Sequence, residues 1–222
     1  MPHLLIAPSI LSADFGKLNE EIASVEHFVD LIHVDVMDGH FVPNLSLGVP
    51  VVESIRCKKP LDVHLMIRCP ERYVEAFAKA VKKAVGEKLA AKSYLVFHAE
   101  TSSDHLGLIA EIHKLGLLAG VALNPDSPLG MLSGDVLQKV DMVLLMTVFP
   151  GFGGQSFIAS VVPKIRELRD LSPELNIQVD GGINGETVVH ARKAGANMIV
   201  AGSYVFGAKD REKAVASLKA EF

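Results

Sequence analysis

Short apolar runs alternate along the chain with stretches in which apolar residues recur every three or four positions. The runs are four to seven residues long, as buried parallel strands are. In the stretches between them, stripes such as Leu18, Ile22 and Val25 indicate amphipathic helices packed on a sheet. The pattern predicts strands over residues 4–7, 30–36, 60–66, 93–98, 117–123, 141–147, 176–180 and 196–201.

Each predicted strand is followed by a helical segment, and this alternation is typical of a parallel sheet. Eight such units in 222 residues favour a single α/β domain over residues 1–222, folded as a (β/α)8 TIM barrel. An open doubly wound sheet is the alternative, but no G-x-G-x-x-G motif follows the first strand. Residues 82–92 exceed a usual turn and are predicted to extend a helix.

Polar residues interrupt three of the predicted strands near their carboxyl ends. His33 and Asp35 are two positions apart in LIHVDVMDGHFVPN and therefore share one face of a strand. His64 lies on the next strand, and Asp180 ends the seventh. Because barrel enzymes gather their catalytic residues at this end of the strands, we expect all four side chains to meet.

Two imidazoles and two carboxylates form a suitable site for Zn²⁺, Fe²⁺, Mn²⁺ or Co²⁺, and the carboxylates also suit acid–base chemistry. The alternative is a set of core groups that hydrogen-bond to one another. Asp62 lies earlier on its strand and is interpreted as structural or as support for a ligand. His98 ends the fourth strand and either reaches the site or is structural. His40 lies in a loop near the site.

Glycines are concentrated in three successive loops that follow the sixth, seventh and eighth predicted strands. The loops read FPGFGGQSF, VDGGIN and VAGSYVFG. Exposed backbone N–H groups in such loops bind anions, and barrel enzymes often hold a phosphate after strands seven and eight. Tight turns alone are the alternative. Since the loops contain no Lys or Arg, a phosphate here would be bound largely by backbone amides.

Three methionines, Met37, Met66 and Met146, come at or just past strand ends. Their polarizable side chains could form an apolar floor or lid beside a reactive centre, or they could simply pack in the core.

Composition and charge narrow the range of partners. The formal charge is −4 with both signs mixed, which does not indicate nucleic-acid binding or attraction to a membrane. The two cysteines, Cys57 and Cys69, are interpreted as reduced thiols rather than a disulfide. No apolar run is long enough to span a bilayer, and the N-terminal run lacks the cationic start of a signal peptide. We therefore expect a cytoplasmic protein.

The motifs together resemble those of the ribulose-phosphate 3-epimerase family over residues 7–207. They are APSILSADF, HVDVMDGHFVPN, LDVHLMI, GVALNPDSP, MTVFPGFGGQSF, VDGGIN and AGSYVFG. The resemblance implies a barrel of the ribulose-phosphate-binding type with one divalent metal held by His33, Asp35, His64 and Asp180, of which Asp35 and Asp180 are the acid/base pair. The residues that it implies touch the substrate are Ser9, His64, Gly151, Phe152, Gly153, Gly154, Asp180, Gly181, Gly182, Gly202 and Ser203.

The implied activity is isomerase chemistry of the pentose phosphate pathway: interconversion of D-ribulose 5-phosphate and D-xylulose 5-phosphate through a 2,3-enediolate. A homo-oligomer is also implied. One alternative is an epimerase for D-allulose 6-phosphate, which would use the same residues. Another is a non-catalytic sugar-phosphate-binding barrel, which would be expected to lose one of the four metal and acid/base residues. The D-x-K-x-x-D motif of the orotidine-phosphate decarboxylase type is absent at Asp35. Phe149 departs from the family pattern, which is usually polar there.

Overall fold

The structure is a computed structural model that describes residues 2–220. Every predicted apolar run forms a strand, and the bounds differ from the prediction by two residues or fewer at each end. The strands are β1 (Leu5–Ala7), β2 (Ile32–Met37), β3 (Leu61–Met66), β4 (Tyr94–His98), β5 (Leu118–Leu123), β6 (Met142–Met146), β7 (Asn176–Asp180) and β8 (Met198–Val200).

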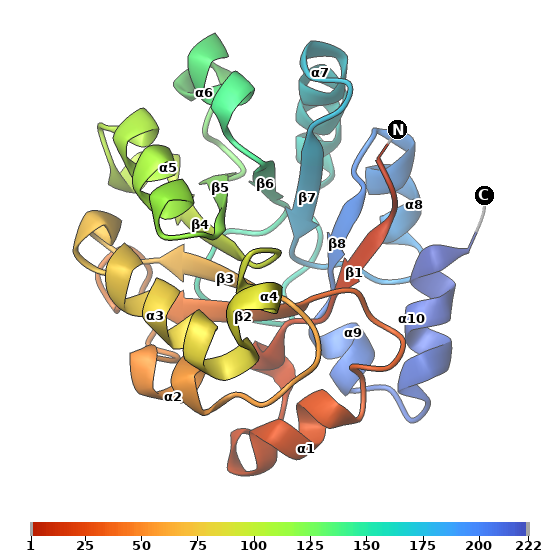
Figure 1. Ribbon diagram of the computed structural model, residues 1–222. Coiled ribbons are helices and arrows are strands. Elements are labelled where there is room, and N and C mark those ends of the chain that lie inside the picture. The colour runs from red at the N-terminus through yellow and green to blue at the C-terminus, as the bar shows by residue number, and fades with distance from the viewer. Residues whose placement is uncertain (1, 221–222) are drawn as a thin grey trace.

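All strands pair in parallel, in the order β1-β8-β7-β6-β5-β4-β3-β2. In Figure 1 the colour therefore runs around the barrel in chain order. The predicted (β/α)8 barrel is confirmed. The pairing of β2 with β3 aligns Asp35 with His64 and Met37 with Met66, so polar residues and methionines form successive levels of the barrel.

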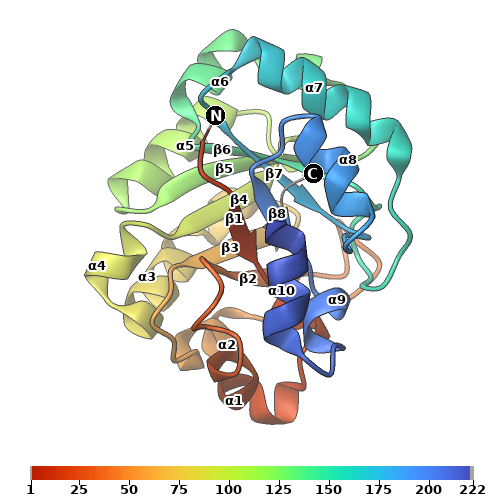
Figure 2. The same cartoon turned by 90° about the vertical axis from the view of Figure 1, so that its right-hand side faces the viewer.

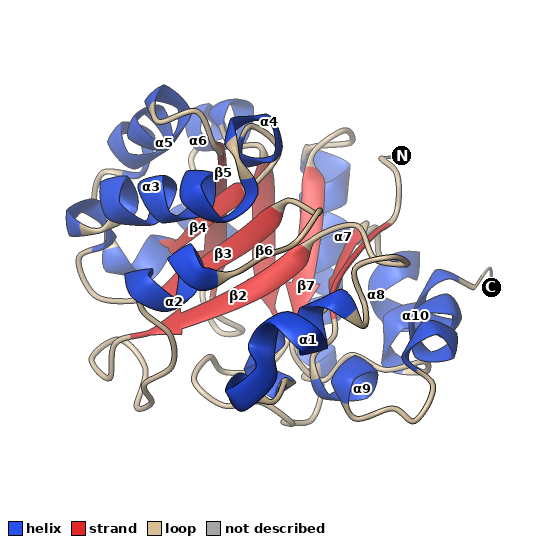
Figure 3. Cartoon of the chain, turned by 60° about the horizontal axis from the view of Figure 1, so that its bottom comes forward, coloured by secondary structure: helices blue, strands red, loops and turns tan. Residues whose placement is uncertain are grey.

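Helices surround the sheet, as Figure 3 shows. Gly86 adopts a φ of +80° and separates two of them. The predicted helix extension over residues 82–92 is thus helical as far as Ala90 but is interrupted at Gly86, because a residue with this φ cannot continue a right-handed helix. The helices are α1 (Leu18–Ala23), α2 (Val49–Ser54), α3 (Val74–Val85), α4 (Glu87–Ala90), α5 (His105–Lys114), α6 (Gly134–Lys139), α7 (Val162–Leu171), α8 (Thr187–Lys193), α9 (Ser203–Phe206) and α10 (Arg211–Lys219).

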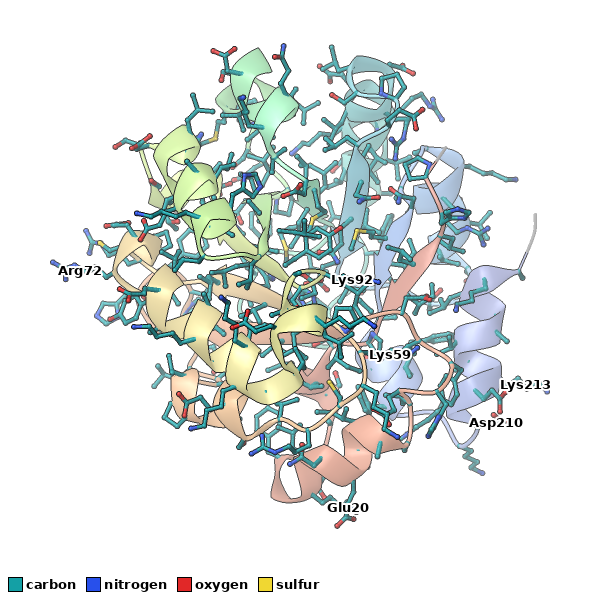
Figure 4. The ribbon with its side chains drawn as sticks, in the orientation of Figure 1. Glu20, Lys59, Arg72, Lys92, Asp210 and Lys213 are labelled. Atoms are coloured by element: carbon teal, nitrogen blue, oxygen red, sulfur yellow. The ribbon has the colours of Figure 1, made fainter. Side chains whose placement is uncertain are left out.

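Two layers of apolar side chains form the core. The larger layer packs between the strands and the helices. The smaller one fills the barrel interior and includes Val96, Leu144 and Met198. The charged residues labelled in Figure 4 on the outer helices, such as Glu20 and Lys213, extend away from this core. No helix among residues 2–220 is both long and apolar enough to cross a membrane.

The ring closes between β1 and β2, at a junction that we call the seam. Here the N–H of Asp30 donates to the carbonyl of Ile6 (3.0 Å), and that of His33 to the carbonyl of Pro8 (3.0 Å). A single bridge pairs Ser9 with His33 beyond the end of β1. Figure 2 views the molecule from the side where β1 lies beside β8, with α8, α9 and α10 around them. Ser9 therefore closes the ring beside the polar residues of β2.

Candidate active site

The carboxyl ends of β2, β3 and β7 bring together the four predicted residues His33, Asp35, His64 and Asp180. One nitrogen or oxygen from each side chain lies within 4.8 Å of the others. The two imidazoles are fully buried, and Asp180 is the most exposed of the four, with 15% of its side chain accessible. Each residue follows a hydrophobic neighbour that points outward into the layer under the helices. The polar side chains are therefore fixed toward the barrel axis.

The two imidazoles direct one ring nitrogen each at both carboxylates. His33 Nε2 lies 3.3 Å from Asp35 Oδ1 and 3.7 Å from Asp180 Oδ2. His64 Nδ1 lies 3.5 Å and 3.9 Å from the same two oxygens. Both nitrogens are buried without a hydrogen bond. Because buried polar atoms are nearly always paired, this convergence makes the four residues a candidate site for a metal ion.

The other ring nitrogen of His33, Nδ1, forms a hydrogen bond with the carboxylate of Asp62. The Nδ1–Oδ2 distance is 2.7 Å, and Gln178 Nε2 donates to the same carboxylate oxygen over 2.6 Å. Both supporting side chains are fully buried. Both interpretations of Asp62, as a structural residue and as support for a ligand, remain compatible with these hydrogen bonds. Gln178 was not predicted from the sequence, although a polar residue two positions before Asp180 must lie on the same face of the strand.

The other nitrogen of His64 meets His98, whose role the sequence left open. The two Nε2 atoms are 2.8 Å apart, and the rings stack with centroids 4.9 Å apart. His98 therefore contacts a residue of the site without bordering the pocket itself.

The two carboxylates differ in their protonation. Burial raises the pKa of Asp35, but the imidazoles of His33 and His64 outweigh it and hold the pKa well below its usual range. Burial raises the pKa of Asp180, and the charge of Asp35 raises it further. For His33, burial lowers the pKa, but the neighbouring carboxylates of Asp35 and Asp62 outweigh burial, and the net pKa is raised. For His64, burial dominates and the pKa is lowered. Asp35 is therefore the ionised member of the pair and Asp180 the more easily protonated one.

Ser9 completes the surroundings of Asp35. Its hydroxyl donates to Asp35 Oδ2, while Asp35 Oδ1 faces the two imidazoles. The Ser9 oxygen also accepts from the N–H of Leu11 and so caps the short turn that follows β1. Ser9, Asp35 and Asp180 all line one pocket at the mouth of the barrel.

The predicted glycine-rich loops form the opposite wall of this pocket. Gly182 is constrained most tightly: its φ is +66°, and a Cβ there would lie 2.3 Å from the backbone nitrogen of Phe157. No Lys or Arg among the described residues lines the pocket, so the wall offers backbone groups and the Ser203 hydroxyl. The loop residues that line it are Gly151, Phe152, Gly153, Gly154, Gly181, Gly182, Gly202 and Ser203.

The three predicted methionines also line the pocket. Met37 and Met66 pack together with Val42 in a small cluster, and Met146 is paired with Asp180 across β6 and β7. They place apolar surface beside the carboxylates, which is the position expected of an apolar floor, and they also pack against other apolar side chains.

Two residues considered from the sequence lie apart from the pocket. The side chain of His40 is 71% exposed, and Asp38 accepts hydrogen bonds from the backbone of His40, Phe41 and Arg68, which shapes the loop after β2. Phe149 is 51% exposed, and its carbonyl accepts from the Gln155 side chain. Neither His40 nor Phe149 borders the pocket.

Comparison with solved structures shows the same fold in distant proteins. A tryptophan synthase α-subunit from Pyrococcus furiosus superposes with a TM-score of 0.71 at 15% identity, covering 99% of both chains. A 3-hexulose-6-phosphate synthase gives a TM-score of 0.67 at 17% identity, covering 97% of this chain and 98% of the other. At this level of identity the likeness shows the fold alone.

Comparison of sequences is more specific. The ribulose-phosphate 3-epimerase family model matches residues 5–206. The ribulose-phosphate 3-epimerase of Bacillus subtilis (strain 168) is 48% identical over 222 residues, covering 96% of this chain and 97% of the relative. That of a Synechocystis strain is 47% identical over 226 residues, covering 98% and 94%. This chain therefore belongs to the ribulose-phosphate 3-epimerase family and is an epimerase, hence an isomerase.

Proposed function

We propose that the protein interconverts D-ribulose 5-phosphate and D-xylulose 5-phosphate by inverting the third carbon of the sugar. The observation that carries this proposal is one pocket that is lined both by an ionised and a protonatable carboxylate and by amide-rich loops. An inversion of this kind requires a base on one face of the carbon and an acid on the other. The family relationship supplies the substrate class.

We further propose that His33, Asp35, His64 and Asp180 hold one divalent metal ion. The two unpaired, buried imidazole nitrogens and the two facing carboxylates support this assignment. Two nitrogen and two oxygen donors suit Zn²⁺, Fe²⁺, Mn²⁺ or Co²⁺ and do not distinguish them. When bound, such an ion supplies Lewis-acid stabilisation of negative charge on the oxygens of the second and third carbons.

The carboxylates perform the proton transfers in this proposal. Asp35, held ionised, removes the proton from the third carbon of one epimer, leaving its electron pair in a 2,3-enediolate. Asp180 donates its proton to the opposite face of that carbon, and the two residues exchange roles in the reverse reaction. They come from β2 and β7, with β1 and β8 between them, so they approach the pocket from different directions.

The rest of the pocket orients the substrate. Backbone N–H groups of the loops after β6, β7 and β8 and the Ser203 hydroxyl, which belong to the lining of the pocket, bind the phosphate. The Ser9 hydroxyl holds Asp35, and the methionines exclude water from the reacting carbon. Fixing the phosphate thus places the third carbon between the two carboxylates.

The test is to replace each carboxylate by its amide. Asp35→Asn and Asp180→Asn should each lower kcat on D-ribulose 5-phosphate by at least about a thousandfold, because each removes one proton-transfer group. His40→Gln, an exposed change near the mouth, is the control and should leave the rate unchanged. Near-normal turnover by either asparagine variant contradicts the two-carboxylate mechanism. A higher rate on D-allulose 6-phosphate than on the five-carbon sugar contradicts the substrate assignment.

A further inference from the structure

A series of polar side chains, buried at His64 and His98 and half-buried at Glu100, leads away from the pocket. His64 Nε2 lies 2.8 Å from His98 Nε2, and His98 Nδ1 lies 3.2 Å from Glu100 Oε2. Both imidazoles are fully buried. Phe41 also packs against the His98 ring, with centroids 4.7 Å apart and the ring planes tilted by 52°. The His98 ring is therefore in contact with both His64 and Phe41.

Glu100, at the far end of this series of side chains, is also held by hydrogen bonds. Glu100 Oε1 accepts a hydrogen bond from the N–H of Asn124 over 2.8 Å and another from the Ser127 hydroxyl. Those two residues belong to the loop after β5, whose carbonyls are bound by the ammonium of Lys164. With Oε1 occupied, only Oε2 is directed at His98.

The direction of each hydrogen bond follows from the ionised carboxylate. Glu100 can only accept, so His98 Nδ1 carries the proton and donates it. In a neutral His98 ring, Nε2 is then the acceptor, and His64 Nε2 must be the donor. His64 consequently keeps its lone pair on Nδ1, the atom that faces Asp35 and Asp180 without a hydrogen bond.

We propose that His98 and Glu100 are positioning residues that fix the tautomer of His64, so that its Nδ1 lone pair points into the candidate metal centre. The inference deepens the proposed function and rests on the metal site within it. His33 is set in the opposite sense, because Asp62 binds its Nδ1 and leaves Nε2 facing the carboxylates. The two histidines thus offer different ring nitrogens, each selected by its own buried partner.

Glu100→Gln is the decisive variant because it should reverse the chain. Asn124 and Ser127 both donate, so the amide oxygen of the glutamine should turn toward them and its NH₂ group toward His98 Nδ1. His98 would then carry its proton on Nε2 and donate it to His64 Nε2. His64 would be left with its proton on Nδ1, where the metal should bind.

Two readouts follow this reversal, and neither uses enzyme activity. Long-range ¹H–¹⁵N correlation spectra of the metal-free protein should show His64 Nδ1 unprotonated in the wild type and protonated in Glu100→Gln. Titration with Zn²⁺ or Co²⁺ should give a dissociation constant about 10–100-fold higher in the variant. Glu111→Gln, an exposed change on α5, is the matched control and should match the wild type in both readouts.

The outcomes separate this inference from the proposed function. A protonated His64 Nδ1 in the metal-free wild type overturns the inference, whatever the variants do. So does a Glu100→Gln protein with the wild-type tautomer and metal affinity. If the tautomer and affinity change as expected while the wild type fails to epimerise D-ribulose 5-phosphate, the positioning role stands and the proposed function fails. If Glu100→Gln folds poorly, His98→Phe is the second variant to test, because it keeps a ring at this position but has no nitrogen. It should weaken metal binding, and unchanged binding overturns the inference.

Discussion

At the scale of single residues, Asp35 shows how one side chain acquires a defined chemical state. Its Oδ1 faces the imidazoles of His33 and His64, and its Oδ2 accepts from Ser9. No side chain among residues 2–220 donates a hydrogen bond to the carboxylate of Asp180, which lies beside the charge of Asp35. Two identical carboxyl groups are thus driven toward opposite protonation states by their surroundings, as an acid–base pair requires.

Gly182 provides a test of the amide-lined wall. Gly182→Ala would place a Cβ within 2.3 Å of the Phe157 backbone, so the loop after β6 must move. We expect the KM for D-ribulose 5-phosphate to rise at least about tenfold, equivalent to ~1.4 kcal/mol of lost binding. Gly134→Ala is the control, because no atom beyond its chain neighbours and its own helix backbone lies within 4 Å of the added Cβ. Steady-state kinetics showing an unchanged KM for Gly182→Ala would argue against phosphate binding at this wall.

The surroundings of Glu100 predict that the stability of the fold depends on pH. Burial raises its pKa, but hydrogen bonds from His98, Ser127 and the Asn124 backbone outweigh this and lower the pKa to about 2. A lowered folded-state pKa stabilises the fold above the ordinary value of 4.5, and this stabilisation is lost as the pH falls toward 2. Denaturant titrations should show Glu100→Gln less stable by on the order of 2 kcal/mol at pH 7.

The same measurement at lower pH supplies the check. The difference in unfolding free energy between wild type and Glu100→Gln should shrink steadily from about pH 5 to about pH 2. A difference that stays constant over this range would show that the ionised form of Glu100 does not stabilise the fold.

At the scale of elements, Lys164 on α7 ties a helix to the loop after β5. Its ammonium donates to the carbonyls of Asn124, Pro125 and Ser127 over 2.5–3.1 Å. Lys164→Met keeps the apolar stem but removes all three bonds, so we expect a loss of about 1–3 kcal/mol in unfolding free energy. Lys79→Met is the control, because its ion pair with Glu75 is exposed to solvent and should contribute little to stability. Equal losses in the two variants would contradict a special role for Lys164.

The sequence predicts the elements well and the buried support of the site only in part. Alternation of apolar runs and helical stripes located each strand, and the two-residue spacing of His33 and Asp35 placed them on one face. Gln178 was missed because its partner, Asp62, is 116 positions away and meets it only across the barrel interior. Gly86 was missed as a break because a single glycine does not reveal its φ. Contacts between distant strands depend on register and barrel geometry, which residue spacing within one strand does not encode.

At the scale of the whole molecule, the candidate metal centre links strands that are far apart in the chain. His33 and Asp35 come from β2, His64 from β3 and Asp180 from β7. A ligand that binds only the folded barrel must raise its stability. At a free metal concentration about 100 times the dissociation constant, the gain is about 2.7 kcal/mol, which corresponds to a Tm about 5–10 °C higher.

Thermal unfolding with each of Zn²⁺, Fe²⁺, Mn²⁺ and Co²⁺, before and after excess chelator, measures this shift. His64→Gln should abolish most of the shift, while His40→Gln should retain it. If none of the four metals raises the Tm, or if His64→Gln responds as the wild type does, the proposed metal site is wrong.

The seam has a consequence for the order of events during synthesis on the ribosome. β1 pairs along its length with β8, whereas a single bridge at Ser9 and individual hydrogen bonds join it to β2 and the residues before it. At typical translation speeds of 5–20 residues per second, β8 emerges about 10–40 s after β1. Until then β1 lacks the strand it pairs with along its length, and the pocket lacks Gly202 and Ser203, so a nascent chain should be inert toward sugar phosphates. Activity should appear only after the final strand has left the exit tunnel.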